Sequence, residues 1–280
     1  MSMSEAKRHV EAARDGTLGV SVALVTAYVG AFVAAELVLA FGDILVGVAV
    51  HAAICLVAIH HRLAIDRRAA GDADRHRPTP ALSAFLLCLS LASVTRICVV
   101  ALPLGDVSQA VWPAIAALPM LVGVNSVRRA GMSGNWEGRG WFSLQRWPRE
   151  LLLAVAGVPL GLLGYVAVRP EALLVDPHVD ADTIVMIGSL LLLACGEEMI
   201  YRGLVQPSLV SVLGRSGVPV AALLVAATTL GDRSWTAFLF VLAMGIGYGA
   251  VVRRTGCLVG VVLAHWLVLV GTLGIWPGVL

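Results

Sequence analysis

The stretch "LGVSVALVTAYVGAFVAAELVLA", residues 18–40, decides the fold class of this chain, because it contains only one charged residue, Glu36. A helix needs about 20 such residues to cross the hydrocarbon core of a bilayer, and similar runs recur along the chain. The whole sequence is 59% hydrophobic and 14% charged, against about 45–50% and 25% in soluble domains. Backbone polar groups in lipid must be satisfied within each segment, and these runs are long rather than alternating. The sequence therefore predicts an all-α fold, a polytopic transmembrane helix bundle.

Hydropathy predicts about eight to nine spans, and the candidate helices lie near residues 18–40, 44–61, 81–102, 109–127, 150–168, 182–201, 217–231, 235–252 and 256–275. Loops rich in Lys and Arg precede the first candidate and follow the second, fourth, sixth and eighth. The intervening loops are poor in basic residues. By the positive-inside rule, we expect a multi-pass protein of the cell membrane with a cytoplasmic N-terminus and, for nine spans, an external C-terminus.

The same order divides the chain into three parts. Residues 1–17 form a polar cytoplasmic segment, residues 18–168 form transmembrane helices with basic cytoplasmic loops, and residues 169–280 form core helices that carry the charged motifs described below. The segment 128–150 mixes three tryptophans, Trp136, Trp141 and Trp147, with arginines, a composition typical of the membrane interface. We expect the lipid bilayer and a membrane-associated protein or peptide as partners, and no nucleic acid.

The five cysteines have no C-x-x-C spacing and are scattered through apolar segments. This pattern favours buried thiols over a disulfide framework or a zinc site. The positions are Cys55, Cys88, Cys98, Cys195 and Cys257.

Ionisable residues within spans are costly unless they find a partner or water. Glu36 lies late in the first candidate helix, Arg96 late in the third, and His51 in the second. We expect Glu36 and Arg96 to be solvated or paired with each other near the outer interface. His51 is isolated in the sequence, which favours a buried imidazole over a ligand.

Glu197, Glu198 and Arg202 differ from these residues because they cluster. On a helix Glu198 and Arg202 are four residues apart and close enough to pair, whereas Glu197 points about a quarter turn away and stays outside that pair. An unpaired carboxylate near the end of a buried helix can act as a general base on water. The alternative is that both acids face the cytoplasmic headgroups. His265 lies mid-span among aliphatic residues, and in one bundle with the two glutamates it is a candidate catalytic partner.

These residues resemble the CAAX protease and bacteriocin-processing (CPBP, or Abi) family of intramembrane proteases. The first family motif is a Glu pair, three residues and Arg-Gly, and this chain reads "EEMIYRG" at 197–203. The last motif is a His late in the final span, here in "RRTGCLVGVVLAHWLVL" at 253–269. The glycine-rich helix between them, "FLFVLAMGIGYGAVV", is also similar to the family. The resemblance covers residues 180–275.

The resemblance implies hydrolysis of a peptide bond in a membrane-associated or lipidated substrate. Glu197 would activate water, Glu198 and Arg202 would orient the site, and His265 would stabilise the oxyanion. It implies no cofactor; a divalent metal among these residues is an older interpretation of the family, and the metal-free mechanism is the one we favour.

Two positions depart from the family pattern. The family carries a second His in an F-x-x-x-H motif about thirty residues after the Glu pair, but residues 223–235 read "LLVAATTLGDRSW", where Asp232 is the possible replacement. The final His is normally followed four residues later by Asn or Asp, and here that position is Leu269. Two other functions therefore stay open. One is a non-proteolytic relative that acts as a membrane scaffold, chaperone or immunity factor. The other is a transporter that uses Glu36, Arg96 and the Glu pair as a relay.

Overall fold

The computed structural model describes the backbone of residues 3–71, 79–101, 110–129, 140–143, 145–170 and 181–280, and the side chains of these residues except 3–18, 68–71, 79–80, 128–129 and 232. The described residues form helices and no strands. Within the part of the chain that the structure describes, seven helices are long and apolar enough to cross a membrane, and one shorter apolar helix, Trp112–Val127, accompanies them. The predicted all-α transmembrane bundle is confirmed.

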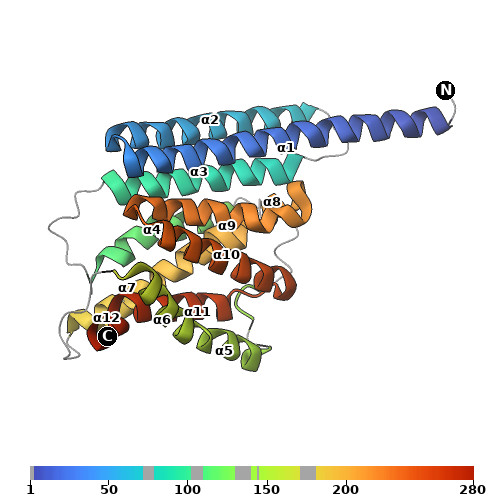
Figure 1. Ribbon diagram of the computed structural model, residues 1–280. Coiled ribbons are helices and arrows are strands. Elements are labelled where there is room, and N and C mark those ends of the chain that lie inside the picture. Colours follow the sequence, from blue (N-terminus) through green and yellow to red (C-terminus); the bar gives the residue numbers. More distant parts are fainter. Residues whose placement is uncertain (1–2, 72–78, 102–109, 130–139, 144, 171–180) are drawn as a thin grey trace.

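The helices are arranged in three tiers (Figure 1). The first tier consists of α1 (Met3–Phe41), α2 (Ile44–Gly71) and α3 (Thr79–Ala101). The middle tier holds α8 (Gln206–Leu213), α9 (Gly217–Ala227) and α10 (Trp235–Thr255). The third tier holds α5 (Trp147–Val155), α6 (Gly157–Val168), α11 (Val259–Val270) and α12 (Trp276–Val279).

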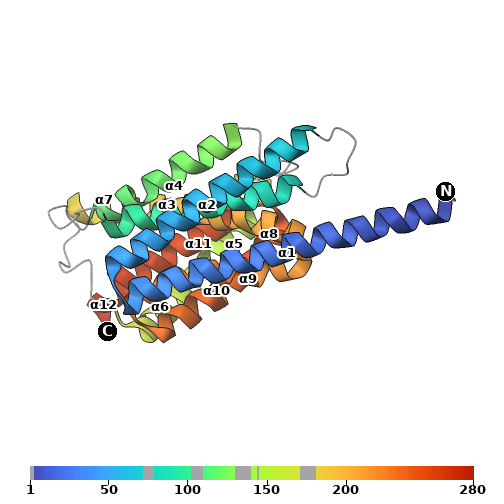
Figure 2. The same cartoon turned by 90° about the horizontal axis from the view of Figure 1, so that it is seen from above.

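Two further helices connect these tiers. The helix α7 (Ala181–Glu198) packs against α4 (Trp112–Arg129) and α11, and the two views agree that α4 lies beside α7 (Figure 2). Four short turns complete the structure, namely the π-helical η3 (Met199–Val205) and η6 (Gly271–Ile275) and the 3₁₀ turns η4 (Gly214–Ser216) and η5 (Thr228–Asp232).

Local sequence signals explain several of these boundaries. The helix α10 begins after Ser234, whose hydroxyl accepts a hydrogen bond from the amide of Ala237 at 3.1 Å, a typical N-cap. It ends at Gly256, which adopts a left-handed conformation with φ 70°. The predicted span 150–168 corresponds to one candidate membrane span, Trp147–Val168, within which α5 ends at Val155 and α6 begins at Gly157.

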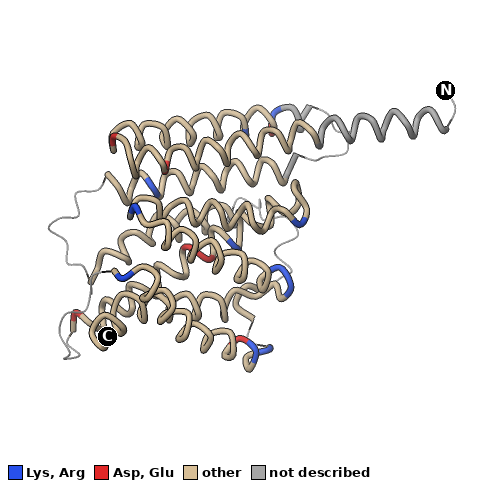
Figure 3. The backbone as a smooth tube through the Cα atoms, in the orientation of Figure 1, with Lys and Arg blue, Asp and Glu red and all other residues tan. Residues whose placement is uncertain are grey.

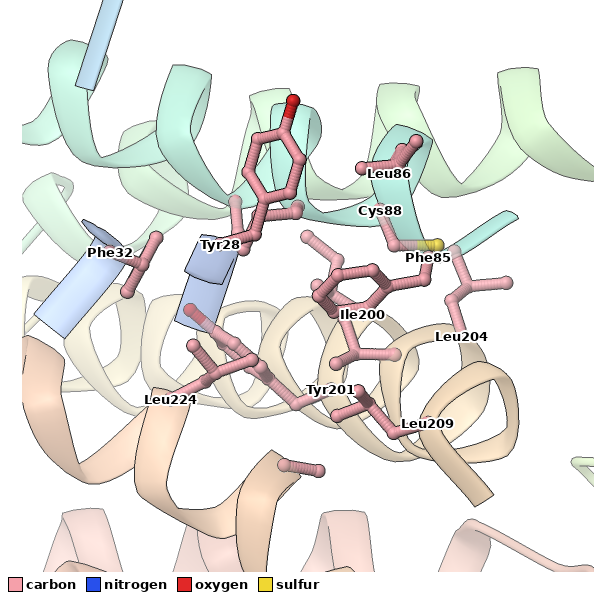
Figure 4. Packing of buried hydrophobic residues seen from close by; sticks show 14 of the residues in the cluster. Tyr28, Phe32, Phe85, Leu86, Cys88, Ile200, Tyr201, Leu204, Leu209 and Leu224 are labelled. Carbon is pink, nitrogen blue, oxygen red and sulfur yellow. The ribbon is translucent and has the colours of Figure 1, made fainter. Parts of the chain in front are cut away.

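The largest apolar cluster lies between the first tier and the middle of the bundle. It contains Phe32 of α1, Phe85 of α3, Leu204 of η3 and Leu224 of α9, all almost completely buried (Figure 4). Tyr201 of η3 lies in the same cluster, directed toward Leu224 and the side on which α1 lies. Because lipid tails are as apolar as these side chains, close van der Waals packing, and not removal from water, holds this cluster together and fixes η3 against the N-terminal helices.

Charges are distributed unevenly along the bundle. Lys and Arg gather where α2, α5, α8 and α10 reach the same end of the molecule (Figure 3). Arg253 and Arg254, for example, lie in the last turn of α10. This distribution agrees with the predicted cytoplasmic loops, whereas the orientation of the N-terminus stays a prediction. Of the basic residues predicted for the loop after α4, Arg139 lies outside the described residues, as does Trp136, whereas Arg128 and Arg129 end α4, with side chains that are not described.

All five cysteines are free, as the sequence predicted. Burial raises the pKa of the Cys257 thiol, which lies between α10 and α11. This thiol is therefore a weak nucleophile at neutral pH.

Candidate active site

The two glutamates lie inside a long helix and not at its end. The sequence predicted a helix over 182–201, but α7 continues through η3 and α8 to Leu213, where Gly214 with φ 61° reverses the chain. That prediction of the helix end was wrong, since the apolar residues of α8 prolong the helix beyond the charged motif. Glu198 is fully buried. The arrangement in which both acids face the headgroup layer is thereby contradicted for Glu198.

The helix changes its winding directly after the glutamates. In η3 the amide of Gln206 donates to the carbonyl of Tyr201, five residues back, so this turn holds one residue more than an α-helical turn. Such π-bulges are frequent at functional sites. Tyr201 and Arg202, both in this turn, are buried. Gln206 donates through Nε2 to the carbonyl of Gly249 at 2.9 Å and thereby joins the turn to α10.

Glu198 is the centre of a buried ionic cluster. Its Oε1 accepts a hydrogen bond of 2.8 Å from His265 Nδ1, and its Oε2 lies 3.4 Å from Arg202 Nε. Because an ionised carboxylate only accepts, the His265 proton on this bond is carried by Nδ1. The side chains of Glu198 and Arg202 are 0% and 4% exposed. The predicted Glu198–Arg202 pair is present, and His265 joins it from α11.

Glu197 is the accessible member of the site. Its Oε2 lies 3.6 Å from His265 Nε2, and its side chain is 26% exposed. No hydrogen bond joins it to another described residue. His265 thus lies between the two carboxylates, with Nδ1 toward the buried one and Nε2 toward the accessible one. The structure brings together four predicted residues: Glu197, Glu198, Arg202 and His265.

The position of His265 depends on how α11 begins. Buried Glu150 of α5 accepts a hydrogen bond of 2.8 Å from the Gly260 amide in the first turn of α11. The amide of Leu258 donates to the carbonyl of Trp141 at 2.8 Å. A carboxylate is favourable at a helix N-terminus because it satisfies a free amide and complements the helix dipole. These two contacts fix the start of α11 and therefore the position of His265.

Sequence reasoning missed one polar residue of the site, Tyr248. It lies on the buried face of α10 between Gly245 and Gly249, and its ring centroid is 6.4 Å from that of His265. Its hydroxyl makes no hydrogen bond with any described residue, as is also true of Arg202 Nη1 and Glu198 Oε2. The signal in the sequence was a hydroxyl-bearing aromatic residue within the glycine-rich stretch of this helix.

Neither departure from the family pattern contributes a hydrogen bond to this cluster among the described side chains. Leu269 packs with Met186, Leu190 and Val270, an apolar environment. The turn η5, which ends at Asp232, packs against α1, α9 and α10. The Asp232 side chain lies outside the described residues, and its replacement of the second His stays a prediction.

Glu36 and Arg96 are paired, as one of the two sequence alternatives predicted. Arg96 Nε and Nη2 donate to Glu36 Oε1 and Oε2 at 2.7 and 2.9 Å. His51 is buried, as the sequence predicted, and its Nε2 lies 3.5 Å from Glu36 Oε1. The structure therefore contains a second buried ionic cluster, built from α1, α2 and α3.

Among the described side chains, the donor set of this site does not suit a metal ion. Within the described residues, no group of three or more His, Cys, Asp and Glu side chains has an arrangement that could hold one. His265 Nδ1 is engaged with Glu198, whose other oxygen faces the Arg202 cation. A catalytic zinc generally takes three protein ligands. The mechanism below therefore contains no step through a metal.

Comparison with known families fits this geometry. Residues 180–270 match the family model described as type II CAAX prenyl endopeptidase Rce1-like. This part of the chain is similar to that family. The match contains all four residues of the cluster and confirms the resemblance predicted from the motifs. Neither the curated proteins nor the solved structures gave a match.

Proposed function

We propose that this protein is an intramembrane endopeptidase in which Glu197 activates water to cleave a peptide bond. The observation that carries the proposal is the asymmetry of the Glu pair. Glu198 is enclosed by Arg202 and His265, whereas Glu197 stays accessible beside them. A general base needs room for the water that it activates, and the partial exposure of Glu197 supports this role.

The reaction follows from these positions. Glu197 removes a proton from a water molecule, and the water oxygen attacks the carbonyl carbon of the scissile bond. The electron pair of the carbonyl moves to its oxygen and forms a tetrahedral oxyanion. When this intermediate collapses, the carbon–nitrogen bond breaks, and Glu197 returns the proton to the leaving amine.

The other three residues hold Glu197 in position. Glu198 accepts the Nδ1 proton of His265, and this bond directs Nε2 toward Glu197. Arg202 balances the charge of Glu198 in the protein interior. This arrangement favours His265 as a residue that orients Glu197 and exchanges protons with it, because both ring nitrogens already face carboxylates.

The substrate class is inferred from the family and from the location of the site. The matching family is described as a CAAX prenyl endopeptidase, and the Glu pair lies within the apolar segment Ala181–Gly231. A substrate has to reach this depth, and a prenyl chain would partition into the bilayer with it. We propose a membrane-associated substrate, with a prenylated C-terminal peptide as the first one to test.

We propose that the reaction needs no metal. Dialysis against EDTA and 1,10-phenanthroline is expected to leave the cleavage rate unchanged within about twofold. A rate that falls more than tenfold and returns with Zn²⁺ would contradict the metal-free mechanism.

The decisive experiment compares the wild type with Glu197→Gln in proteoliposomes. The probe is an internally quenched peptide with a farnesylated cysteine three residues from its C-terminus, and mass spectrometry of membranes from expressing cells gives an independent search for cleaved proteins. We expect Glu197→Gln to lower cleavage at least a thousandfold, since it removes the base. Asp182→Asn is the matched control, because Asp182 is an exposed acid in the first turn of the same helix. A Glu197→Gln protein with full activity would contradict the proposal.

The non-proteolytic alternative is supported by one specific observation. Leu269, where the family has Asn or Asp, packs in an apolar cluster and offers no hydrogen bond to a substrate. The same experiment separates the two functions. Equal abundance of the two proteins and identical membrane fragments would favour a scaffold, chaperone or immunity factor.

A further inference from the structure

The segment 128–150, whose composition is typical of the membrane interface, contains two tryptophans that the structure describes, and they differ in their surroundings. Trp147 opens α5 and is 61% exposed, as expected for an interfacial side chain. Trp141 is half-buried and packs against two apolar clusters, the largest one and the one that contains Leu258 and Ala264. A location at the interface therefore does not by itself explain the position of Trp141.

The indole of Trp141 lies against the π-helical turn η3. Gly203 follows Arg202 in this turn and is buried. A Cβ at Gly203 would stand 3.0 Å from both Cη2 and Cζ2 of the indole. This is closer than the roughly 3.5–4.0 Å at which two carbon atoms attract each other best. The indole thus approaches the backbone of η3 this closely because residue 203 has no side chain.

The backbone of the same tryptophan holds the start of α11. The Trp141 carbonyl accepts a hydrogen bond from the Leu258 amide at 2.8 Å and one from Cys257 Sγ at 3.4 Å. Leu258 is almost completely buried and directly precedes α11. Trp141 therefore contacts η3 through its side chain and the start of α11 through its carbonyl.

The geometry of the active site depends on the distance between these two segments. His265 comes from α11, whereas its partner Glu198 is the last residue of α7, directly before η3. The hydrogen bond of 2.8 Å between them tolerates little displacement. In lipid, removal from water does not drive helices together, so close packing and hydrogen bonds set the distances between them. Trp141 supplies one contact of each kind.

We propose that Trp141 is a positioning residue of the active site, which fixes the start of α11 against η3 and thereby holds His265 between the two glutamates. The inference rests on the proposed function and adds a residue that none of the sequence motifs contains. Trp141 acts through His265 and Glu198 and touches no reacting atom. Its loss is therefore expected to slow the chemical step much more than it weakens substrate binding.

The test measures kcat, per amount of folded protein, and KM for the farnesylated quenched peptide in proteoliposomes. Trp141→Leu removes the indole and keeps the carbonyl. We expect it to lower kcat about ten- to a hundredfold, the effect of a displacement of about 1 Å, with KM changed less than about threefold. Trp147→Leu removes an exposed indole from the same segment and is the matched control, expected to keep the wild-type kcat. Trp141→Phe keeps a smaller ring and is expected to lie between Trp141→Leu and the wild type.

A second pair of variants tests the contact between the indole and η3. Gly203→Ala places a methyl group against the indole, and it is expected to lower kcat by a similar factor through overpacking. In Trp141→Leu/Gly203→Ala the methyl group occupies space that the indole has left. We expect the double variant to be at least about fivefold faster than the slower single variant, because the two residues are in contact and their effects are not additive.

Hydrogen exchange of the peptide that contains the Leu258 amide gives a readout that needs no activity. If the indole holds the loop in place, this amide loses protection when the indole is removed. Trp141→Leu is therefore expected to speed its exchange about tenfold or more, and Trp147→Leu to leave it unchanged. Where Gly203→Ala does not fold, this exchange and the kcat of Trp141→Leu decide.

Each contrary outcome overturns the inference. A wild-type kcat in Trp141→Leu, or an equal fall in Trp147→Leu, shows that the buried indole does not position the site. A raised KM with the wild-type kcat shows that Trp141 contacts the substrate instead. A double variant as slow as the slower single variant shows that the contact with Gly203 does not carry the effect. These results leave the proposed function intact, whereas the absence of Glu197-dependent cleavage in the wild type overturns both.

Discussion

The N-terminal helices and the C-terminal core each bury a carboxylate, an arginine and a histidine, but they use them differently. In α1–α3, Glu36 accepts hydrogen bonds from Arg96 at both carboxylate oxygens, so the single carboxylate is paired with the single arginine. In α7, η3 and α11, Glu198 forms ion pairs with Arg202 and His265, and a second carboxylate, Glu197, remains accessible. The comparison teaches that a reactive group arises where a buried cluster holds one carboxylate more than its partners can satisfy.

The strongest test of this comparison is Glu198→Gln. It leaves the buried cation of Arg202 without a counter-charge, so we expect a loss of about 3–5 kcal/mol of unfolding free energy. Thermal unfolding in detergent measures this free energy, and Glu197→Gln, at the adjacent position, is the matched control. Because Glu197 is partly exposed and lacks a hydrogen bond, that variant is expected to change stability by less than about 0.5 kcal/mol. Equal losses for the two variants would contradict the division into a structural and a reactive glutamate.

Glu36→Gln examines the corresponding carboxylate of the N-terminal helices. It removes the counter-charge of Arg96, but the guanidinium keeps some exposure and can recover hydration. We expect a smaller loss, about 2–3 kcal/mol, in the same unfolding measurement. A larger loss of unfolding free energy than for Glu198→Gln would show that the cluster of Glu36 contributes more to stability than the cluster of Glu198.

Glycine substitutions compare the packing of the two regions at a smaller scale. A Cβ at Gly157 of α6 would collide with the backbone of Ala264, the neighbour of His265, whereas nothing lies within 4 Å of a Cβ at Gly30 of α1. We expect Gly157→Ala to cost about 1–3 kcal/mol by overpacking, and to slow cleavage by moving α11. Gly30→Ala is expected to stabilise by up to about 1 kcal/mol through helix propensity. If both variants behave alike in thermal unfolding and peptide cleavage, close packing of α6 on α11 does not position His265.

Part of the candidate site was already predictable from residue spacing. Glu198 and Arg202 are four residues apart on a helix, and their pair survives the π-helical turn. The pairing of Glu36 with Arg96 was one of two expected outcomes, because two opposite charges at similar depth in lipid lower each other's cost. The end of the sixth predicted helix was wrong, since hydropathy marks the apolar run and carries no signal for a helix that continues past a charged motif.

The sequence by itself determined that this protein lies in a lipid bilayer and that its secondary structure is helical, because long apolar runs with few charges are stable only as helices in lipid. It also determined the family resemblance, through the order of the Glu pair, the arginine and the final histidine. Spacing also predicted that Glu198 pairs with Arg202 and that Glu197 does not. Only the tertiary structure decided that His265 joins the pair and that Glu197 stays partly exposed. That choice depends on how α11 places His265 against α7, with its start fixed by Glu150 and Trp141.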